Sequence, residues 1–404
     1  MDVVVRDVPV LCTMDEGEGP LGLRFDVAIG IHGGRIAWIG PAGNAPSAPV
    51  VRSAKGAVVV PGLIDCHTHS VWAGTRSEEW RRRIAGETYA EILQSGGGIL
   101  STVRQTRAAS TAKLLALATR RLIHLKRRGV TRIEVKSGYG LSVDHEVRLL
   151  RVARAAAERA GMAVRTTFLG AHAIPEEWRH DRAGYVNDLI ENQIPAAAPV
   201  ADAVDVYVDR GAFTVEEGHS ILSAGRANGL SLRIHAEQNT YTGAAAMAAA
   251  LGAESADHLE RIDDAGIAAM ARSGTKAVLL PGAMAWLRDQ APPVDRLREA
   301  GVPMAVATDL NPGSSPFFDP WTVLALACAG MRLRPEEALR GMTRVAADVL
   351  GWADAGRIRV GSPAELVAVS PPPGEPCTPS ALLCNVNGNR VRWVISGDST
   401  ALLR

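Results

Sequence analysis

Residues 58–69 read VVVPGLIDCHTH, an apolar run that ends in two histidines, His67 and His69. The apolar part is typical of a buried β-strand, and successive side chains along a strand point to opposite sides. Two histidines that stand two residues apart therefore face the same side at the strand end. Such a pair can hold a metal ion, although closely spaced histidines also occur by chance on protein surfaces.

The central part of the chain repeats a pattern of strand followed by helix. Apolar runs alternate with stretches of helical period such as 108–127 and 143–160. Eight such units predict an α/β fold, a (β/α)8 TIM-like barrel, which we place at residues 58–354. The expected strands end near Asp65, Lys136, Gly170, Val208, His235, Asp257, Leu280 and Asp309.

Both ends of the chain look different from the centre. Residues 1–57 and 355–404 contain short apolar runs that are separated by Gly, Pro and Asn, which is typical of strands and tight turns. We therefore expect one small β-sandwich domain that is built from both termini.

Composition and charge exclude several classes of protein. The 404 residues include 44 basic and 43 acidic side chains, and this net charge of +1 gives no overall attraction to nucleic acid or an anionic membrane. No apolar run approaches the length of a membrane span, and the N-terminus has no basic, apolar leader. The five cysteines are scattered without a C-x-x-C pair. We expect a cytoplasmic protein that acts on a small molecule.

In a barrel of this kind the active site lies at the carboxyl ends of the strands, so polar residues that end an apolar run are candidate site residues. Five histidines do not meet this criterion, lie in helical or loop contexts, and are assigned no role: His32, His124, His145, His180 and His219. The residues that meet the strand-end criterion are His67, His69, His172, His235, His258 and Asp309.

Imidazoles together with a carboxylate suit zinc or iron, with a position left open for water. The metal would lower the pKa of that water and polarise the carbon under attack, and Asp309 and His258 could move the proton. Lys136 raises the alternative of a carbamylated lysine that bridges two metals, but a lysine beside a strand end is usually a plain charge. We expect one divalent or trivalent metal ion per subunit.

Longer runs resemble the imidazolonepropionase family of metal-dependent amidohydrolases, and this resemblance covers nearly the whole chain. The runs that carry it are PGLIDCHTH (61–69), AGTR (73–76), GGGILSTV (96–103), EVKSGYG (134–140), FLGAHAIPE (168–176), SADHL (255–259) and ATDLNPGSSP (307–316).

The resemblance implies hydrolysis of 4-imidazolone-5-propanoate to N-formimidoyl-L-glutamate in histidine degradation, by a homodimer. It implies that the metal ligands are His67, His69, His235 and Asp309. It implies that the substrate pocket is lined by Arg76, Tyr139, His172, Gln238, Asn311, Gly313 and Ser314. Among these, His172 would also be catalytic, by stabilising the oxyanion or holding the ring oxygen.

The physical roles of these residues are plausible but have ordinary alternatives. Arg76 offers a forked cation for a carboxylate tail, although it could equally be a surface arginine. Tyr139 stands between two glycines and could be displayed over the pocket or packed on the surface. Asn311 and Gly313 could present amide and backbone N–H groups to the substrate, or they could simply form a turn.

Two positions depart from the pattern of the family. Some relatives carry a carboxylate where Gln238 stands, and an amide cannot act as a general base, so we assign that duty to Asp309 and His258. Ser314 stands where threonine is more usual, and it keeps the hydroxyl group.

Two other functions remain open on the residues alone. Another mononuclear amidohydrolase, such as a deaminase of a cyclic base, would use the same histidines and aspartate. Arg76 and the NPG run at 311–313 favour a carboxylated imidazolone instead. A non-catalytic relative of the barrel would be expected to lack metal ligands, and here every expected ligand is present.

Overall fold

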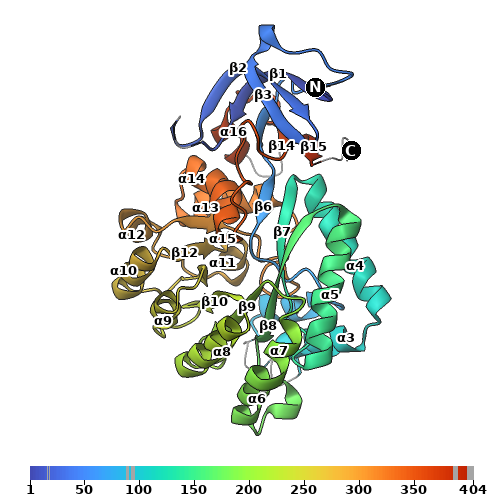
Figure 1. Ribbon diagram of the computed structural model, residues 1–404. Coiled ribbons are helices and arrows are strands. Elements are labelled where there is room, and N and C mark those ends of the chain that lie inside the picture. Colours follow the sequence, from blue (N-terminus) through green and yellow to red (C-terminus); the bar gives the residue numbers. More distant parts are fainter. Residues whose placement is uncertain (16, 18, 88–90, 92–95, 385–389, 398–404) are drawn as a thin grey trace.

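The computed structural model describes residues 1–15, 17, 19–87, 91, 96–384 and 390–397, which form a barrel with a second, smaller sheet beside it (Figure 1). Every neighbouring pair in the barrel sheet is parallel, so the predicted (β/α)8 architecture is confirmed. The barrel strands, in their order around the sheet, are β6 (Leu63–Asp65), β7 (Val130–Lys136), β8 (Ala163–Ala171), β9 (Ala203–Val208), β10 (Ser231–Ala236), β11 (Ser255–His258), β12 (Lys276–Leu279) and β13 (Met304–Val306).

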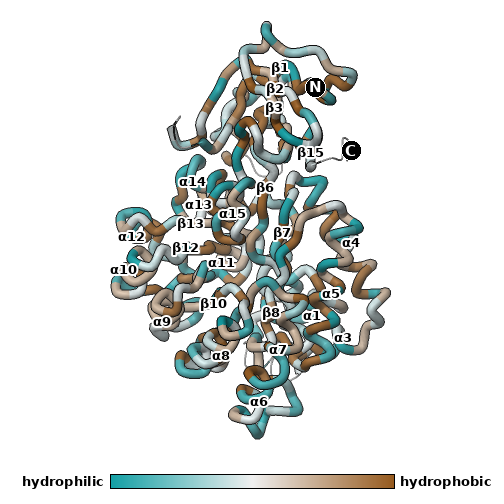
Figure 2. Tube along the Cα trace, viewed as in Figure 1, coloured by the Kyte–Doolittle hydropathy of each residue, from teal (hydrophilic) through white to brown (hydrophobic). Residues whose placement is uncertain are grey.

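Helices between these strands cover the barrel and pack apolar side chains against it. Helix α5 (Val143–Ala160) buries residues at helical spacing, including Leu149, Val152 and Ala156, and it ends at Gly161 in the left-handed conformation. In Figure 2 the covering helices carry both hydrophobic and hydrophilic residues. The other α-helices are α1 (Ser77–Ile84), α3 (Ile99–Ala108), α4 (Thr111–Arg127), α6 (Arg182–Asp188), α7 (Ile194–Ala197), α8 (Val215–Ala227), α9 (Ala244–Ala250), α10 (Asp264–Ser273), α11 (Pro281–Leu287), α12 (Val294–Glu299), α13 (Pro320–Met331), α14 (Pro335–Arg340), α15 (Ala346–Val349) and α16 (Pro379–Leu383).

The first and last barrel strands meet at what we call the barrel seam. Across the described residues, β6 and β13 share no ladder of their own, and the residues that follow them close the ring. Thr68 and Leu310 form an isolated parallel bridge, and the Asp309 N–H donates to the His67 carbonyl at 3.0 Å. The buried Asp65 carboxylate accepts from both the N–H and the hydroxyl of Thr308, at 3.0 and 2.6 Å. The segments that carry the predicted ligands His67, His69 and Asp309 therefore also close the barrel.

The second sheet combines both ends of the chain and forms the expected β-sandwich, with its own apolar core. Its order is β15-β14-β5-β1-β2-β3, and β4 pairs with β1. Its strands are β1 (Val3–Cys12), β2 (Leu23–His32), β3 (Arg35–Pro41), β4 (Val50–Ser53), β5 (Val58–Pro61), β14 (Glu365–Ser370) and β15 (Arg390–Ser396).

The apolar run at 58–65 is divided between the two sheets. Strand β5 pairs with β1 and β14, although we expected the barrel to begin at residue 58. The run breaks at Gly62, where a Cβ atom would lie 2.6 Å from a methyl carbon of Thr131. The Gly62 N–H donates to the backbone carbonyl of Glu365. The domain limits of 1–57 with 355–404, and of 58–354, stay a prediction, and residues 398–404 lie outside the described chain.

Candidate metal centre

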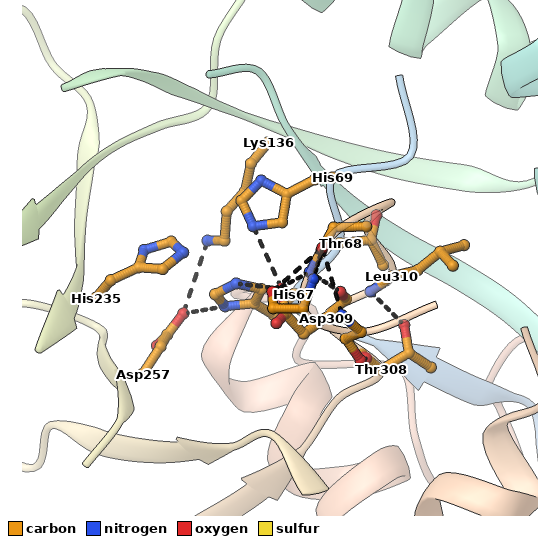
Figure 3. A network of polar contacts seen from close by, with 12 residues as sticks. His67, Thr68, His69, Lys136, His235, Asp257, Thr308, Asp309 and Leu310 are labelled. Atoms are coloured by element: carbon orange, nitrogen blue, oxygen red, sulfur yellow. Dashed lines mark hydrogen bonds and ion pairs between the residues drawn. The ribbon is translucent and has the colours of Figure 1, made fainter. Parts of the chain in front are cut away.

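Three histidines from two strand ends come together inside the mouth of the barrel (Figure 3). His67 and His69 follow β6, His235 lies on β10, and one potential ligand atom from each lies within 4.8 Å of the others. All three side chains are buried. Asp309, which follows β13, places Oδ1 3.5 Å from His67 Nε2 and 3.4 Å from His69 Nε2. The four predicted ligands therefore converge on one small space.

The chemistry of this space fits a metal ion. Within the described part of the chain, His67 Nε2 and His235 Nε2 are buried without a hydrogen-bond partner, which is costly unless another group satisfies them. Burial lowers the pKa of His67 well below its ordinary value and also lowers that of His69, so these rings are neutral, as metal ligands must be.

Carboxylates behind the rings fix the orientation of two of these histidines. His67 Nδ1 donates to Asp257 at 2.6 Å, and His235 Nδ1 donates to Asp205 at 3.0 Å. Such a bond fixes the tautomer and leaves Nε2 free to bind a metal. Neither carboxylate was among the predicted site residues. The signal was available for Asp205, because an acidic residue inside the apolar strand AVDVYV is rare unless it is paired.

His172 and His258 lie beside the three histidines, as predicted. The His172 ring stacks on His69 with 5.1 Å between centroids, and the His258 ring lies 5.5 Å from that of His235. Burial lowers the pKa of His172 well below its ordinary value. Burial opposes the charged form of His258, but Glu260, Asp309 and Asp257 together raise its pKa above the ordinary value.

The contact of His172 with the backbone defines what the neutral ring can do. Its Nδ1 lies 3.1 Å from the carbonyl of Gly138, which can only accept, so Nδ1 carries the hydrogen. Nε2 of the neutral ring is then an acceptor. That arrangement suits an N–H group of a substrate, whereas the oxyanion role that we predicted would require a protonated ring.

The predicted pocket residue Tyr139 is held by a buried glutamate that the sequence analysis missed. The Tyr139 ring lies 5.9 Å from that of His69 and 5.6 Å from that of His172. Glu146, on α5, accepts from the backbone N–H groups of Gly138, Gly140 and Leu141. Burial raises the pKa of Glu146. No sequence signal separated this residue from an ordinary acidic residue in the first turn of a helix.

Arg76 and Gly313 are also brought together, although they are far apart in sequence. A Cβ atom at position 313 would lie 2.8 Å from Cζ of Arg76, so only glycine allows the guanidinium to occupy this place. Arg76 pairs with Glu79, to which its Nε donates at 2.8 Å, and Glu79 also accepts from the Gly98 N–H. The sequence analysis did not foresee this partner.

Asn311 and Ser314 shape the loop in which they lie. Asn311 Oδ1 accepts from the N–H groups of Gly313 and Ser314 at 2.8 and 2.7 Å, and its Nδ2 donates to the Asp309 carbonyl at 2.7 Å. The Asn311 amide therefore holds the loop after Asp309 in shape. Gln238 is buried, and its backbone carbonyl accepts a hydrogen bond from the Arg261 side chain.

Comparison with known proteins agrees with this site. A family model described as "Amidohydrolase family" matches residues 58–399, and the barrel with its histidine cluster is what this class of metal-dependent hydrolases requires. The imidazolonepropionase of Shewanella baltica (strain OS185) is 48% identical over 365 residues, which cover 88% of this chain and 89% of the relative. That of Shewanella woodyi is 47% identical and covers 87% and 88%. The chain belongs to the imidazolonepropionase family of amidohydrolases.

Solved structures share the fold at low sequence identity. A triazine hydrolase variant superposes with a TM-score of 0.76 at 17% identity, covering 98% of this chain and 93% of its own. An adenosine deaminase from Xanthomonas campestris with bound zinc gives a TM-score of 0.73 at 18% identity, covering 98% and 91%. These likenesses support the barrel and its flanking sheet. None of the helices that the structure describes is long and apolar enough to cross a bilayer.

Proposed function

We propose that this chain opens the ring of 4-imidazolone-5-propanoate by adding water across a carbon–nitrogen bond, which gives N-formimidoyl-L-glutamate. The observation that carries the proposal is the convergence of His67, His69, His235 and Asp309 in a chain that is 48% identical to a named imidazolonepropionase over most of its length.

We propose that these four side chains hold one zinc or iron ion per subunit. The unpartnered Nε2 atoms of His67 and His235, together with the Asp309 oxygen that lies 3.4 Å from His69 Nε2, support such a site. A bound ion would polarise the bond under attack and lower the pKa of a coordinated water. Nitrogen and carboxylate ligands accept either metal, so the ligand set does not favour one of them.

The residues around the four ligands have distinct tasks in this reaction. Asp309 and His258 would take a proton from water and return one to the ring nitrogen that leaves. Gln238 is an amide and cannot do this. His172 would accept a hydrogen bond from a ring N–H through Nε2, and Arg76 would pair with the propanoate tail. Tyr139, ordered by the loop that Glu146 holds, would pack over the bound ring.

We further propose a cytoplasmic homodimer that has neither nucleic acid nor a membrane as a partner. The balanced charge supports the absence of these partners, the scattered cysteines support the compartment, and the family resemblance suggests the dimer. A sedimentation measurement that gave a single monomeric species at micromolar concentration would contradict the dimer.

The test of the activity is an assay with freshly generated imidazolonepropanoate, run before chelation, after chelation and after return of zinc or ferrous iron. We expect the absorbance of the imidazolone to fall only with metal present. Release of ammonia from cyclic bases, with no change in imidazolone absorbance, would instead identify a deaminase. Protein that binds no metal and turns over neither substrate would identify a non-catalytic barrel.

A further inference from the structure

A buried lysine lies among three carboxylates beneath the histidine cluster. Lys136, at the end of β7, has no exposed side-chain surface. Its Nζ donates to Glu134 at 2.9 Å and forms ion pairs with Asp205 at 2.8 Å and Asp257 at 3.7 Å. Figure 3 shows this amino group directed toward Asp257, whose carboxylate also faces the ring of His67. The proposed reaction assigns no task to this lysine.

Each of the three carboxylates also contacts the metal-binding segments. Asp205 uses Oδ2 for Lys136 and Oδ1 for the His235 ring. Asp257 faces Lys136 and His67 with the same oxygen, Oδ2. Glu134 uses Oε1 for Lys136, and its Oε2 lies 3.3 Å from the backbone N of the residue between His67 and His69.

The backbone of the lysine strand adds two more contacts to the same segment. Thr68 lies between the two histidines that follow β6. Its hydroxyl donates to the Glu134 carbonyl at 2.8 Å, and its own carbonyl accepts from the Lys136 N–H at 2.8 Å. One residue therefore lies between Lys136 and each histidine. That residue is Asp257 for His67, Asp205 for His235, and Thr68 for His69.

We propose that Lys136 is a positioning residue for the metal centre, which holds the carboxylates of Asp205 and Asp257 where they orient His235 and His67. This role rests on the metal site proposed above but not on the identity of the substrate. An ammonium group suits the position because it has three donors and one positive charge for three close carboxylates, which would otherwise repel one another. Outer partners of this kind commonly contribute 10- to 100-fold to metal affinity.

The same cluster disfavours the carbamylated lysine that the sequence left open. A carbamate on Nζ would replace the positive charge of Lys136 by a negative one, beside Glu134, Asp205 and Asp257, all of which are buried. It would also occupy the space in which these carboxylates now meet the ammonium group. The lysine therefore serves as the resident cation of the cluster.

The test uses zinc affinity, measured by competition with a chelating indicator, in three variants of the full chain. Lys136→Met removes the charge but nearly keeps the volume. Because that variant leaves three carboxylates uncompensated and could fail to fold, the second variant is Glu134→Gln with Lys136→Met, which removes one charge of each sign. The control is Lys126→Met, since Lys126 is also buried but its Nζ donates only to the carbonyls of Ala160 and Gly161.

We expect the double variant to fold and to bind zinc at least about 10-fold more weakly than the unmodified chain. Its cobalt-loaded form should show an altered visible spectrum, because the histidines are no longer fixed. Lys126→Met should lower the melting temperature without changing either property. Zinc affinity of the folded double variant within about threefold of the unmodified chain, with an unchanged cobalt spectrum, would overturn the proposal. An unmodified chain that binds no zinc or cobalt would overturn the metal site and this role together, whereas failure of the substrate assay alone would leave this role intact.

Discussion

Replacing Gly313 by alanine tests the predicted role of Arg76 without touching the arginine. The new Cβ would lie 2.8 Å from Arg76 Cζ, whereas ordinary carbon contacts are about 3.5–4.0 Å. The guanidinium must therefore move by about 1 Å. Gly313 does not have a positive φ, so the backbone accepts alanine.

The magnitude follows from the hydrogen bond that the displaced guanidinium would lose to the substrate carboxylate. A hydrogen bond to a charged group contributes about 1.5–3 kcal/mol, and about 1.4 kcal/mol corresponds to a factor of ten. We expect KM for imidazolonepropanoate to rise about 10- to 100-fold, while kcat and the melting temperature change little.

Steady-state kinetics of a double-mutant cycle with Arg76→Ala provides the assay. If Arg76 is the only route of the effect, Gly313→Ala should add almost nothing in the Arg76→Ala background. The control is Gly43→Ala, because a Cβ there meets open space. An unchanged KM in Gly313→Ala, or additive effects of the two substitutions, would refute the assignment of Arg76 to the substrate tail.

Three further predictions follow from the site and the seam. Asp309→Asn should abolish turnover, whereas Gln238→Ala should mainly raise KM; comparable losses of kcat in both would contradict this division of labour. Chelation should abolish activity and lower the melting temperature. Zinc at about 100 times its Kd should restore about 2.7 kcal/mol of stability. A melting temperature that does not change on chelation would contradict the proposed metal site. Burial raises the pKa of Asp65 to about 7, so its contribution to stability is full below about pH 4 and is lost as pH rises through about 7. The urea midpoint of the metal-free Asp65→Asn variant, relative to that of the metal-free unmodified chain, should therefore rise between pH 5 and 8. A difference between the two midpoints that does not change with pH would disprove this.

Much of the fold could be predicted from the sequence because the strands of a parallel barrel are buried on both faces and appear as separate apolar runs. The limits of the first strand could not. Residues 58–65 form one apolar run, and the strand partners that divide it between two sheets are distant in sequence. The last strand ends at Val306, earlier than the polar residue Asp309 suggested.

The histidines of the site could be predicted because strand ends converge at one rim of a barrel. Apart from Asp205, whose place inside an apolar strand is a signal, the residues behind them could not be predicted, since their partners are distant in sequence. Asp257 is separated from His67 by 190 positions, and nothing local indicates that they meet. Glu146 resembles any acidic residue at a helix start, and its three backbone partners appear only in the folded loop. Asn311 looks like a substrate contact, whereas its amide is engaged within its own loop.

The barrel seam makes metal binding a matter of chain topology as well as chemistry. Asp65 and Thr308, which clasp the two edges, are 243 residues apart, and the predicted ligands His67, His69 and Asp309 lie immediately beyond them on the same two edges. An ion held there would cross-link the ends of an open sheet, and closing a loop of this length costs on the order of 5 kcal/mol in chain entropy. Release of the ion should therefore first increase the rate of amide hydrogen exchange at Asp309 and His69, before exchange becomes faster in any covering helix. The supply of metal in a cell would then set the lifetime of the folded protein as well as its rate of turnover.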